Sequence, residues 1–187
     1  SAWDLKHTLV ASYQYQLPLE RLTHRFKALT QGWAISGITR VSTGFPVTLA
    51  SDGDNSLQGS IPNGVNNKSL DLPDFTQGPL HLDAHSPDGQ YCDTSLFAPN
   101  ALGTPGSASR RSFHGPGMFN TDLTLARDIH LTETKALQFR LEAFNVFNHV
   151  QFFGPVAVNG DIDSNLFGQI VNSALPRLLQ LAAKFTF

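Results

Sequence analysis

Two histidines and an aspartate come closest to a metal-binding pattern in this sequence of 187 residues. His81, Asp83 and His85 alternate, so an extended backbone would place all three on one side. Imidazole and carboxylate groups are common zinc ligands, and the single cysteine, Cys92, follows nearby. No matching fourth ligand or group that would orient the ligands is evident. Solvated loop histidines are the commoner case, so we expect no metal site and no cofactor.

Two other groups of polar residues invite a binding interpretation. Asp52, Asp54 and Asn55 resemble the start of a calcium-binding loop, but the glycine and glutamate of such a loop are missing at the required offsets. A turn is the simpler interpretation of this segment. Arg110 and Arg111 could contact an anionic ligand, but a solvated pair in a loop is the better explanation. Neither group predicts a site.

Composition and motifs exclude several classes of protein. The chain contains no phosphate-binding glycine loop, nucleophile elbow or zinc-binding helix motif, and no spacing singles out two of its 15 acidic residues. We therefore expect that it is not an enzyme. The net charge is −2 and like charges do not cluster, which argues against a nucleic-acid partner. Apolar runs do not exceed three residues, whereas a membrane-spanning helix needs roughly 20.

The amino-terminal residues, Ser-Ala-Trp-Asp, include no initiator methionine and do not resemble a signal peptide. We therefore expect the chain to be a processed or excised part of a longer protein.

Segments of alternating polarity are the strongest structural signal. Each has apolar residues on one parity and polar or charged residues on the other, which is typical of β-strands. They lie near residues 7–17, 32–49, 119–131, 135–145 and 177–187. The long segments between them, 50–118 and 146–176, have no sustained period and are rich in turn-forming residues.

The segments 119–131 and 135–145 predict a hairpin with a defined register. Folding about Glu133 pairs Leu125 with Leu141 on the apolar face and Asp128 with Gln138 on the polar face. The same register pairs Ile129 with Leu137, Leu123 with Ala143, and Thr124 with Glu142. Because both faces agree in polarity under one register, the pairing is well specified.

Strands of this length with one apolar and one polar face are typical of a transmembrane β-barrel. Placing 18–31 and 132–134 on the inner side puts both long connections, 50–118 and 146–176, on the outer side, as such barrels require. Barrels need at least about eight strands to close. The predicted fold is therefore all-β, an antiparallel transmembrane β-barrel segment with long extracellular loops that supplies about five to six strands of a larger barrel.

Several motifs together resemble one family. They are Gly115-Pro-Gly117, Asp122-Leu-Thr-Leu-Ala-Arg127, Leu137 to His149, Gly32 to Arg40, and the tail from Phe167 to Phe187. Combined, they resemble the carboxyl-terminal barrel of TonB-dependent receptor-like (Oar-like) outer-membrane proteins. The similarity runs almost end to end and is weakest over residues 50–90.

The resemblance implies a cell outer-membrane location and a full-length protein with an amino-terminal immunoglobulin-like domain, a plug and a barrel of roughly 22 strands. It implies transport, namely TonB-driven uptake of a bulky solute. The implied partners are outer-membrane lipid, the remainder of the barrel, the plug, the barrel-assembly machinery, and TonB through segments outside this chain. The resemblance also implies an assembly signal in the last strand, carried by Leu179, Leu181, Ala183, Phe185 and Phe187.

The polar parity of the strands carries charges that a barrel would direct into its lumen. These residues are Arg40, Asp122, Asp128, Arg140, Glu142 and Lys184. They could line a solute path, but a structural network of cross-strand charges or plug contacts is the simpler interpretation. Arg127 lies on the apolar parity, and we expect it to extend toward the inner membrane interface.

A soluble, secreted β-sandwich that binds glycan or protein through residues 50–118 is the alternative. The aromatic residues discriminate between the two folds. In a barrel, Trp33, Tyr13 and Tyr15 face lipid near the interfaces, whereas in a sandwich they are buried between two sheets. Burial of Leu125, Leu141, Leu181 and Phe185 inside a compact core would contradict the barrel.

Overall fold

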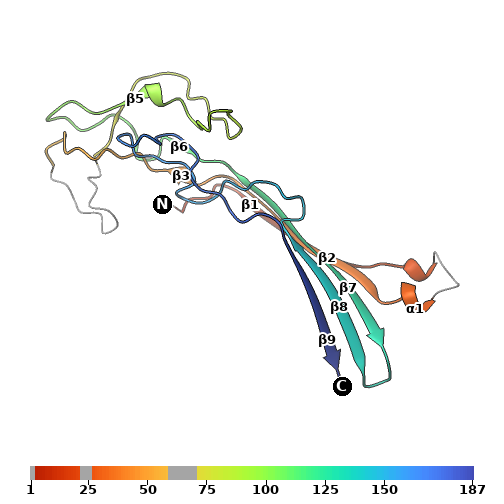
Figure 1. The fold of residues 1–187 in the computed structure, drawn as a ribbon. Coiled ribbons are helices and arrows are strands. Elements are labelled where there is room, and N and C mark those ends of the chain that lie inside the picture. The colour runs from red at the N-terminus through yellow and green to blue at the C-terminus, as the bar shows by residue number, and fades with distance from the viewer. Residues whose placement is uncertain (1–2, 22–26, 59–70) are drawn as a thin grey trace. The chain divides into compact units, whose positions relative to one another are not determined.

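The computed structural model describes residues 3–21, 27–58 and 71–187. Its strands are β1 (Thr8–Gln16), β2 (Trp33–Ser42), β3 (Pro46–Val47), β4 (Asp74–Phe75), β5 (Phe97–Ala98), β6 (Phe113–His114), β7 (Met118–His130), β8 (Ala136–Phe144) and β9 (Leu178–Thr186). Short helices are η1 (Leu19–Arg21), α1 (Lys27–Thr30) and η2 (Thr94–Leu96) (Figure 1). Within the described ranges, no helix has the length and apolar character needed to span a membrane.

The chain divides into two compact units. The sheet unit comprises Thr8–Val41, Phe119–Gln151 and Leu175–Phe187, and the loop unit comprises Ser1–His7, Ser42–Met118 and Phe152–Ala174.

The sheet unit is a single antiparallel sheet of five strands in the order β1-β2-β7-β8-β9, so that strands adjacent in the sheet follow one another along the unit (Figure 1). The alternation seen in the sequence gives each strand one apolar and one polar side, because successive side chains of a strand point to opposite faces. The tight turn after His130 joins β7 to β8, and Leu131 and Thr132 both donate backbone hydrogen bonds to the Lys135 carbonyl.

The predicted hairpin register is confirmed. Leu125 pairs with Leu141 on one face, and Asp128 pairs with Gln138 on the other. The remaining predicted pairs, Ile129 with Leu137, Leu123 with Ala143 and Thr124 with Glu142, also lie opposite one another. Strand β9 continues the pattern, since Leu181 pairs with Leu141. The apolar residues therefore form rows that cross three neighbouring strands.

The prediction of one continuous strand over 32–49 is wrong. Strand β2 ends at Ser42, and β3 belongs to a separate small sheet with β6 in the loop unit. The cause is a close crossing of backbones at Gly44, where a Cβ atom would lie 1.7 Å from the Gly115 carbonyl oxygen. The alternation that continues through Phe45, Val47 and Leu49 reflects burial in the core of the loop unit and not a longer strand.

The loop unit has its own hydrophobic core, although its sequence shows no regular period. Two short sheets, β3–β6 and β4–β5, frame this core. Its buried members are Val47, Leu49, Tyr91, Cys92, Phe97, Ala108, Phe113 and Val158. Strands of two residues are too short to show an alternation of apolar and polar residues in the sequence. The sequence pattern therefore did not predict the strands of the loop unit.

Candidate functional site

The apolar face of the five-stranded sheet is open to its surroundings. Leu141, Leu181 and Phe185 are 42%, 83% and 51% exposed, and Tyr13 and Tyr15 are also exposed. Within the described residues, the second sheet that a β-sandwich needs over these side chains is not present. An exposed apolar surface of this extent marks an interaction site, and rows of leucine and phenylalanine suit a hydrocarbon environment.

A tyrosine and a glycine fit together on this face near the middle of β2. A Cβ atom at Gly37 would lie 2.7 Å from the Tyr13 hydroxyl, so the tyrosine side chain occupies the space that the glycine leaves free. The Tyr13 hydroxyl lies 3.5 Å from the Thr39 hydroxyl, which in turn lies 3.1 Å from the Thr121 hydroxyl. Aromatic cover of a strand glycine, together with this hydrogen-bond chain, ties β1, β2 and β7 together.

The polar face carries interacting charged and amide side chains. Gln138 donates from Nε2 to an Asp128 oxygen at 2.8 Å, across the β7–β8 ladder. Arg140 and Glu142 form an ion pair at 3.6 Å along β8. The sequence predicted that these four side chains share a face, and the structure also brings Lys184 opposite Gln138 in the register of β9.

A groove of about 500 Å³, lined by polar residues together with Tyr13, Gly37, Ile38 and Phe144, lies between β1, β2, β7 and β8. Its lining includes Ser12, Gln14, Ser36, Asp122 and Thr124. One Asp122 oxygen accepts hydrogen bonds from Asn120 Nδ2 at 3.0 Å and from the Asn145 backbone N–H at 2.9 Å. These contacts fix the position of its carboxylate on the polar face, whereas Arg40 lies exposed on β2.

The motif Phe144 to His149 forms an ordered turn at the end of β8. Asn145 and Asn148 both adopt a φ of 51°, a left-handed conformation that asparagine tolerates better than most residues. Asn145 Nδ2 donates a hydrogen bond to the His149 carbonyl at 3.0 Å, and the His149 backbone N–H donates one to Asn145 Oδ1 at 3.1 Å. Asn148 Oδ1 accepts from the Arg177 N–H at 3.1 Å. The two asparagines therefore have a structural explanation.

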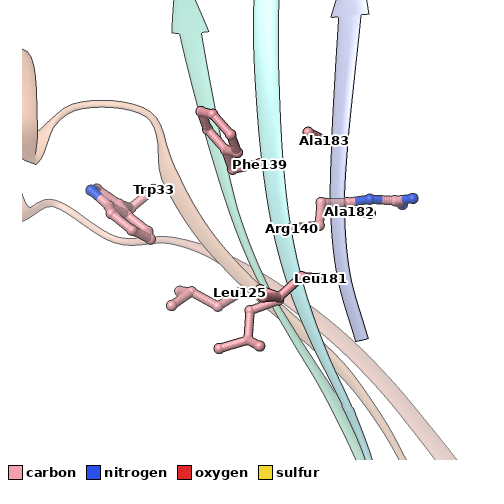
Figure 2. A pocket seen from close by; sticks show the side chains of 8 residues that line it. Trp33, Leu125, Phe139, Arg140, Leu181, Ala182 and Ala183 are labelled. Atoms are coloured by element: carbon pink, nitrogen blue, oxygen red, sulfur yellow. The ribbon is translucent and has the colours of Figure 1, made fainter. Parts of the chain in front are cut away.

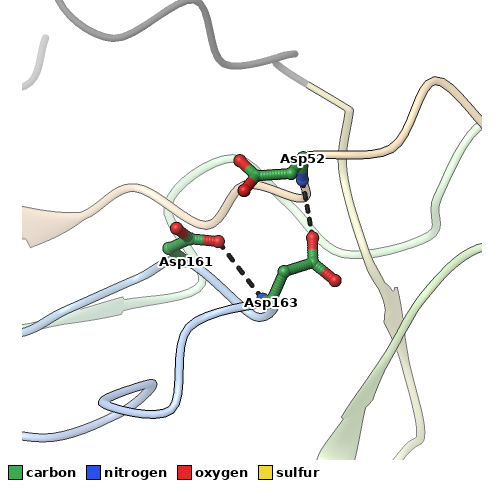
Figure 3. Close-up of side chains that lie close together, drawn as sticks. All are labelled: Asp52, Asp161 and Asp163. Atoms are coloured by element: carbon green, nitrogen blue, oxygen red, sulfur yellow. Dashed lines mark hydrogen bonds between the residues drawn. The ribbon is translucent and has the colours of Figure 1, made fainter.

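In the loop unit, three aspartates lie together (Figure 3). One carboxylate oxygen from each of Asp52, Asp161 and Asp163 lies within 4.8 Å of the others. Asp163 Oδ2 accepts from the Ser51 hydroxyl at 2.9 Å and from the Asp52 N–H at 2.6 Å, and Asp161 Oδ1 accepts from the Asp163 N–H at 3.2 Å. Carboxylates are suitable calcium ligands, but these bonds within the loops already account for the cluster.

The predicted metal candidates form no comparable group. His81, Asp83 and His85 are exposed, and Asp83 Oδ1 accepts a bond from the His85 N–H at 2.8 Å, as in an ordinary turn. The backbone carbonyl of Asp54 accepts a hydrogen bond from the Leu57 N–H at 3.1 Å, in agreement with the expected turn. The sequence pattern did not group Asp161 and Asp163 with Asp52, because the two segments are far apart in the chain.

Buried polar groups stabilise the loop unit. Burial alone would raise the pKa of Asp71, but hydrogen bonds from the Ser56 N–H, from Asn100 and from the Leu72 N–H lower it below its ordinary value. Burial raises the pKa of Tyr91 to about 12, and its hydroxyl donates to the His114 carbonyl at 2.9 Å.

Cys92 should resist thiol reagents as long as the loop unit is folded. Burial raises the pKa of its thiol to about 11, and the charge of Asp93 adds to the effect. At pH 8 the thiolate fraction is then about a hundredfold lower than for an ordinary cysteine. We expect labelling of the folded protein by N-ethylmaleimide to be at least that much slower than labelling in urea, and to accelerate as the pH rises toward 11. Mass spectrometry of the Cys92 peptide measures both rates, and equal rates would contradict the burial.

Comparison with known proteins gives a match that agrees with this geometry. The family model described as "Outer membrane beta barrel domain" matches residues 1–180. No curated protein and no solved structure matches the chain. The family match covers nearly the whole chain, and the sheet unit has the exposed apolar face and the polar face that a barrel wall needs. The chain therefore belongs to the outer membrane beta barrel domain family and is a protein of the outer membrane.

Proposed function

We propose that this chain forms wall strands and outer loops of a TonB-dependent receptor-like (Oar-like) transporter that takes up a bulky solute. The observation that carries the proposal is the two-faced sheet of β1, β2, β7, β8 and β9. Its apolar side is exposed, and its polar side holds charges in hydrogen bonds and an ion pair. A wall with these two faces separates lipid from a hydrated interior.

The open edges of the sheet support membership of a larger barrel. Strands β1 and β9 each have one neighbour in the described sheet. Backbone groups left unpaired in hydrocarbon cost several kcal/mol each, so the edges need further strands of the same barrel. A barrel of about 22 strands encloses a plugged lumen. We assign the polar face, including Asp128, Arg140 and Glu142, to contacts with the plug and to cross-strand support.

The loop unit supplies the surface that would meet the solute first. Its longest segment follows β2 and precedes β7 in the chain, and the unit has a buried core of its own instead of being an extended connection. Loops that carry function are commonly attached to a rigid scaffold. We place this unit outside the membrane and assign solute capture to it, without any catalytic step.

We further propose that β9 carries a signal for the barrel-assembly machinery. Leu179, Leu181 and Phe185 alternate along β9 and are 62%, 83% and 51% exposed. Ala183 shares their parity within β9, and Phe187 continues it just past the strand. Such a regular apolar row at the edge of the sheet offers both side chains and backbone groups to a receptor that pairs strands.

Conductance of the full-length protein in a planar bilayer tests the transporter proposal. A barrel closed by a plug is expected to carry no steady current, and deletion of the plug is expected to open a stable conducting pore. A steady current through the intact protein would instead indicate an open porin, and absence of a pore after plug deletion would argue against a transport lumen. Loss of uptake in cells that lack TonB would add support for energy coupling.

A further inference from the structure

A lysine on the polar face lies at the edge of the described sheet. Lys184 is exposed on β9, opposite Gln138 of β8. The Gln138 amide donates from Nε2 to Asp128 at 2.8 Å, so it stands between that carboxylate and the lysine. Asp128 is two strands away from Lys184, about 10 Å at the usual strand spacing. No hydrogen bond or ion pair joins Lys184 to another residue that the structure describes.

The carboxylates of the same face already have partners within the sheet unit. Asp122 accepts two hydrogen bonds, and Asp128 accepts the one from Gln138. Glu142 forms an ion pair with Arg140 at 3.6 Å. None of these acids lies directly opposite the lysine in the ladder of β8 and β9. The charge at the edge of the sheet therefore needs a counter-charge from beyond β9.

A second cation increases this need. Arg140 lies opposite Ala182, which precedes Lys184 by two residues, so two positive charges are diagonal neighbours across the β8–β9 ladder. Figure 2, drawn around an apolar groove of about 470 Å³ that Arg140 also borders, shows the Arg140 side chain pointing away from Leu125 and Leu181. Like charges at neighbouring positions of one face repel. A carboxylate on the outer side of β9 would offset this repulsion.

The outer edge of β9 requires a further strand in the membrane. In the described sheet, β9 has one neighbour, β8. Backbone groups of the other edge cannot stay unpaired in hydrocarbon, so a closed barrel adds an antiparallel strand there. Residues directly opposite one another in such a ladder share a face of the sheet. One side chain of the added strand therefore meets Lys184 on the polar face.

From this placement we propose that the strand next to β9 carries an aspartate or glutamate directly opposite Lys184. Opposite charges in directly opposed positions stabilise a pair of strands, whereas like charges there destabilise it. The acid would extend the cross-strand row of Asp128, Gln138 and Lys184 by one strand. The proposal depends on the chain being part of an outer-membrane barrel, and not on transport.

Charge complementarity favours a strand of the same full-length protein over a second copy of this chain. The other open edge of the sheet is β1, and its sequence TLVASYQYQ contains no acidic residue. Strand β9 itself, LLQLAAKFT, contains none either. Pairing of two copies through either edge would thus leave Lys184 without a counter-charge. The acid is expected in a segment of the protein outside residues 1–187.

Carbodiimide cross-linking of the full-length protein in outer-membrane vesicles tests this inference. The reagent EDC joins a lysine amine to a carboxylate only when the two groups are in contact, and mass spectrometry of the digest identifies both residues. We expect a link from Lys184 to an aspartate or glutamate in a segment of alternating polarity outside residues 1–187. Lys184→Arg keeps the charge but removes the reactive amine, so this link is expected to be lost.

Gln180→Lys in the Lys184→Arg protein is the matched control. Gln180 lies on the same face of β9, directly opposite Glu142, so its replacement is expected to form a link to Glu142. This link reports that the reagent reaches directly opposed residues on the polar face. Absence of any link from Lys184, or a link only to Asp128 or to a segment without strand alternation such as the proposed plug, would overturn the proposal.

Exchange of the two charges separates an ion pair from mere proximity. Lys184→Glu is expected to lower the temperature at which the barrel loses its heat-modifiable gel mobility, because two carboxylates would then oppose one another. Lysine in place of the cross-linked acid should restore the wild-type temperature in the Lys184→Glu protein. If the exchanged protein is no more stable than Lys184→Glu alone, the two residues do not form a pair and the proposal is wrong.

Discussion

Replacing Leu125 with arginine is expected to lower the free energy of unfolding of the membrane-inserted protein by about 2–4 kcal/mol. Leu125 lies midway along β7, in the apolar row with Leu141 and Leu181. If this row faces hydrocarbon near the centre of the membrane, the new guanidinium must either lose its hydration or distort the bilayer. Urea titration of the full-length protein folded into phosphatidylcholine vesicles measures the cost.

Thr124→Arg provides the matched control because it changes the adjacent residue of the same strand. Thr124 points to the polar face and lies opposite Glu142, so an arginine there gains an oppositely charged cross-strand neighbour. We expect its effect on the free energy of unfolding to stay within about 1 kcal/mol. If the two variants are equally destabilised, the two faces do not differ in their environment, and the assignment of the apolar face to lipid fails.

The sheet unit could be predicted in detail because two independent signals agree in it. Apolar and polar residues alternate along each strand, and the turn at Thr132 to Lys135 permits one register in which both faces keep their polarity. Strands β1, β7, β8 and β9 lie within a residue or two of the predicted segments. An incorrect register would have placed Asp128 and Gln138 among leucines, which the sequence pattern excludes.

The loop unit could not be predicted because its contacts join distant segments through very short strands. Val47 pairs with Phe113, and Phe75 pairs with Phe97, in ladders of two residues each. No period arises over such lengths, so its aromatic core and the aspartate cluster have no local sequence signal. The contact between Arg127 on β7 and the Trp33 ring on β2 was also missed, because it joins strands that are far apart in the sequence.

Gly44→Ala is expected to open the loop unit, and Cys92 reports the opening. A Cβ atom at Gly44 would lie 1.7 Å from the Gly115 carbonyl oxygen and 2.7 Å from the Pro116 carbonyl oxygen. Backbone cannot move aside as a flexible side chain can, so the crossing of the two segments must separate. Val47 lies three residues after Gly44, Phe113 lies two residues before Gly115, and both belong to the same core as Cys92. We expect a loss of about 3 kcal/mol, or about a hundredfold more of the opened unit.

Gly115→Ala is the matched control, since Gly115 lies on the other side of the same crossing. Its Cβ atom would meet no heavy atom closer than 3.6 Å, which is ordinary van der Waals contact. Neither glycine has a positive φ, so the two substitutions restrict the unfolded chain alike. Labelling of Cys92 by N-ethylmaleimide should be fast in the Gly44→Ala protein and as slow as in wild type in the Gly115→Ala protein. Slow labelling in both variants would mean that the crossing at Gly44 does not hold the core of the loop unit closed, and the view of this unit as a preformed capture surface would lose its structural support.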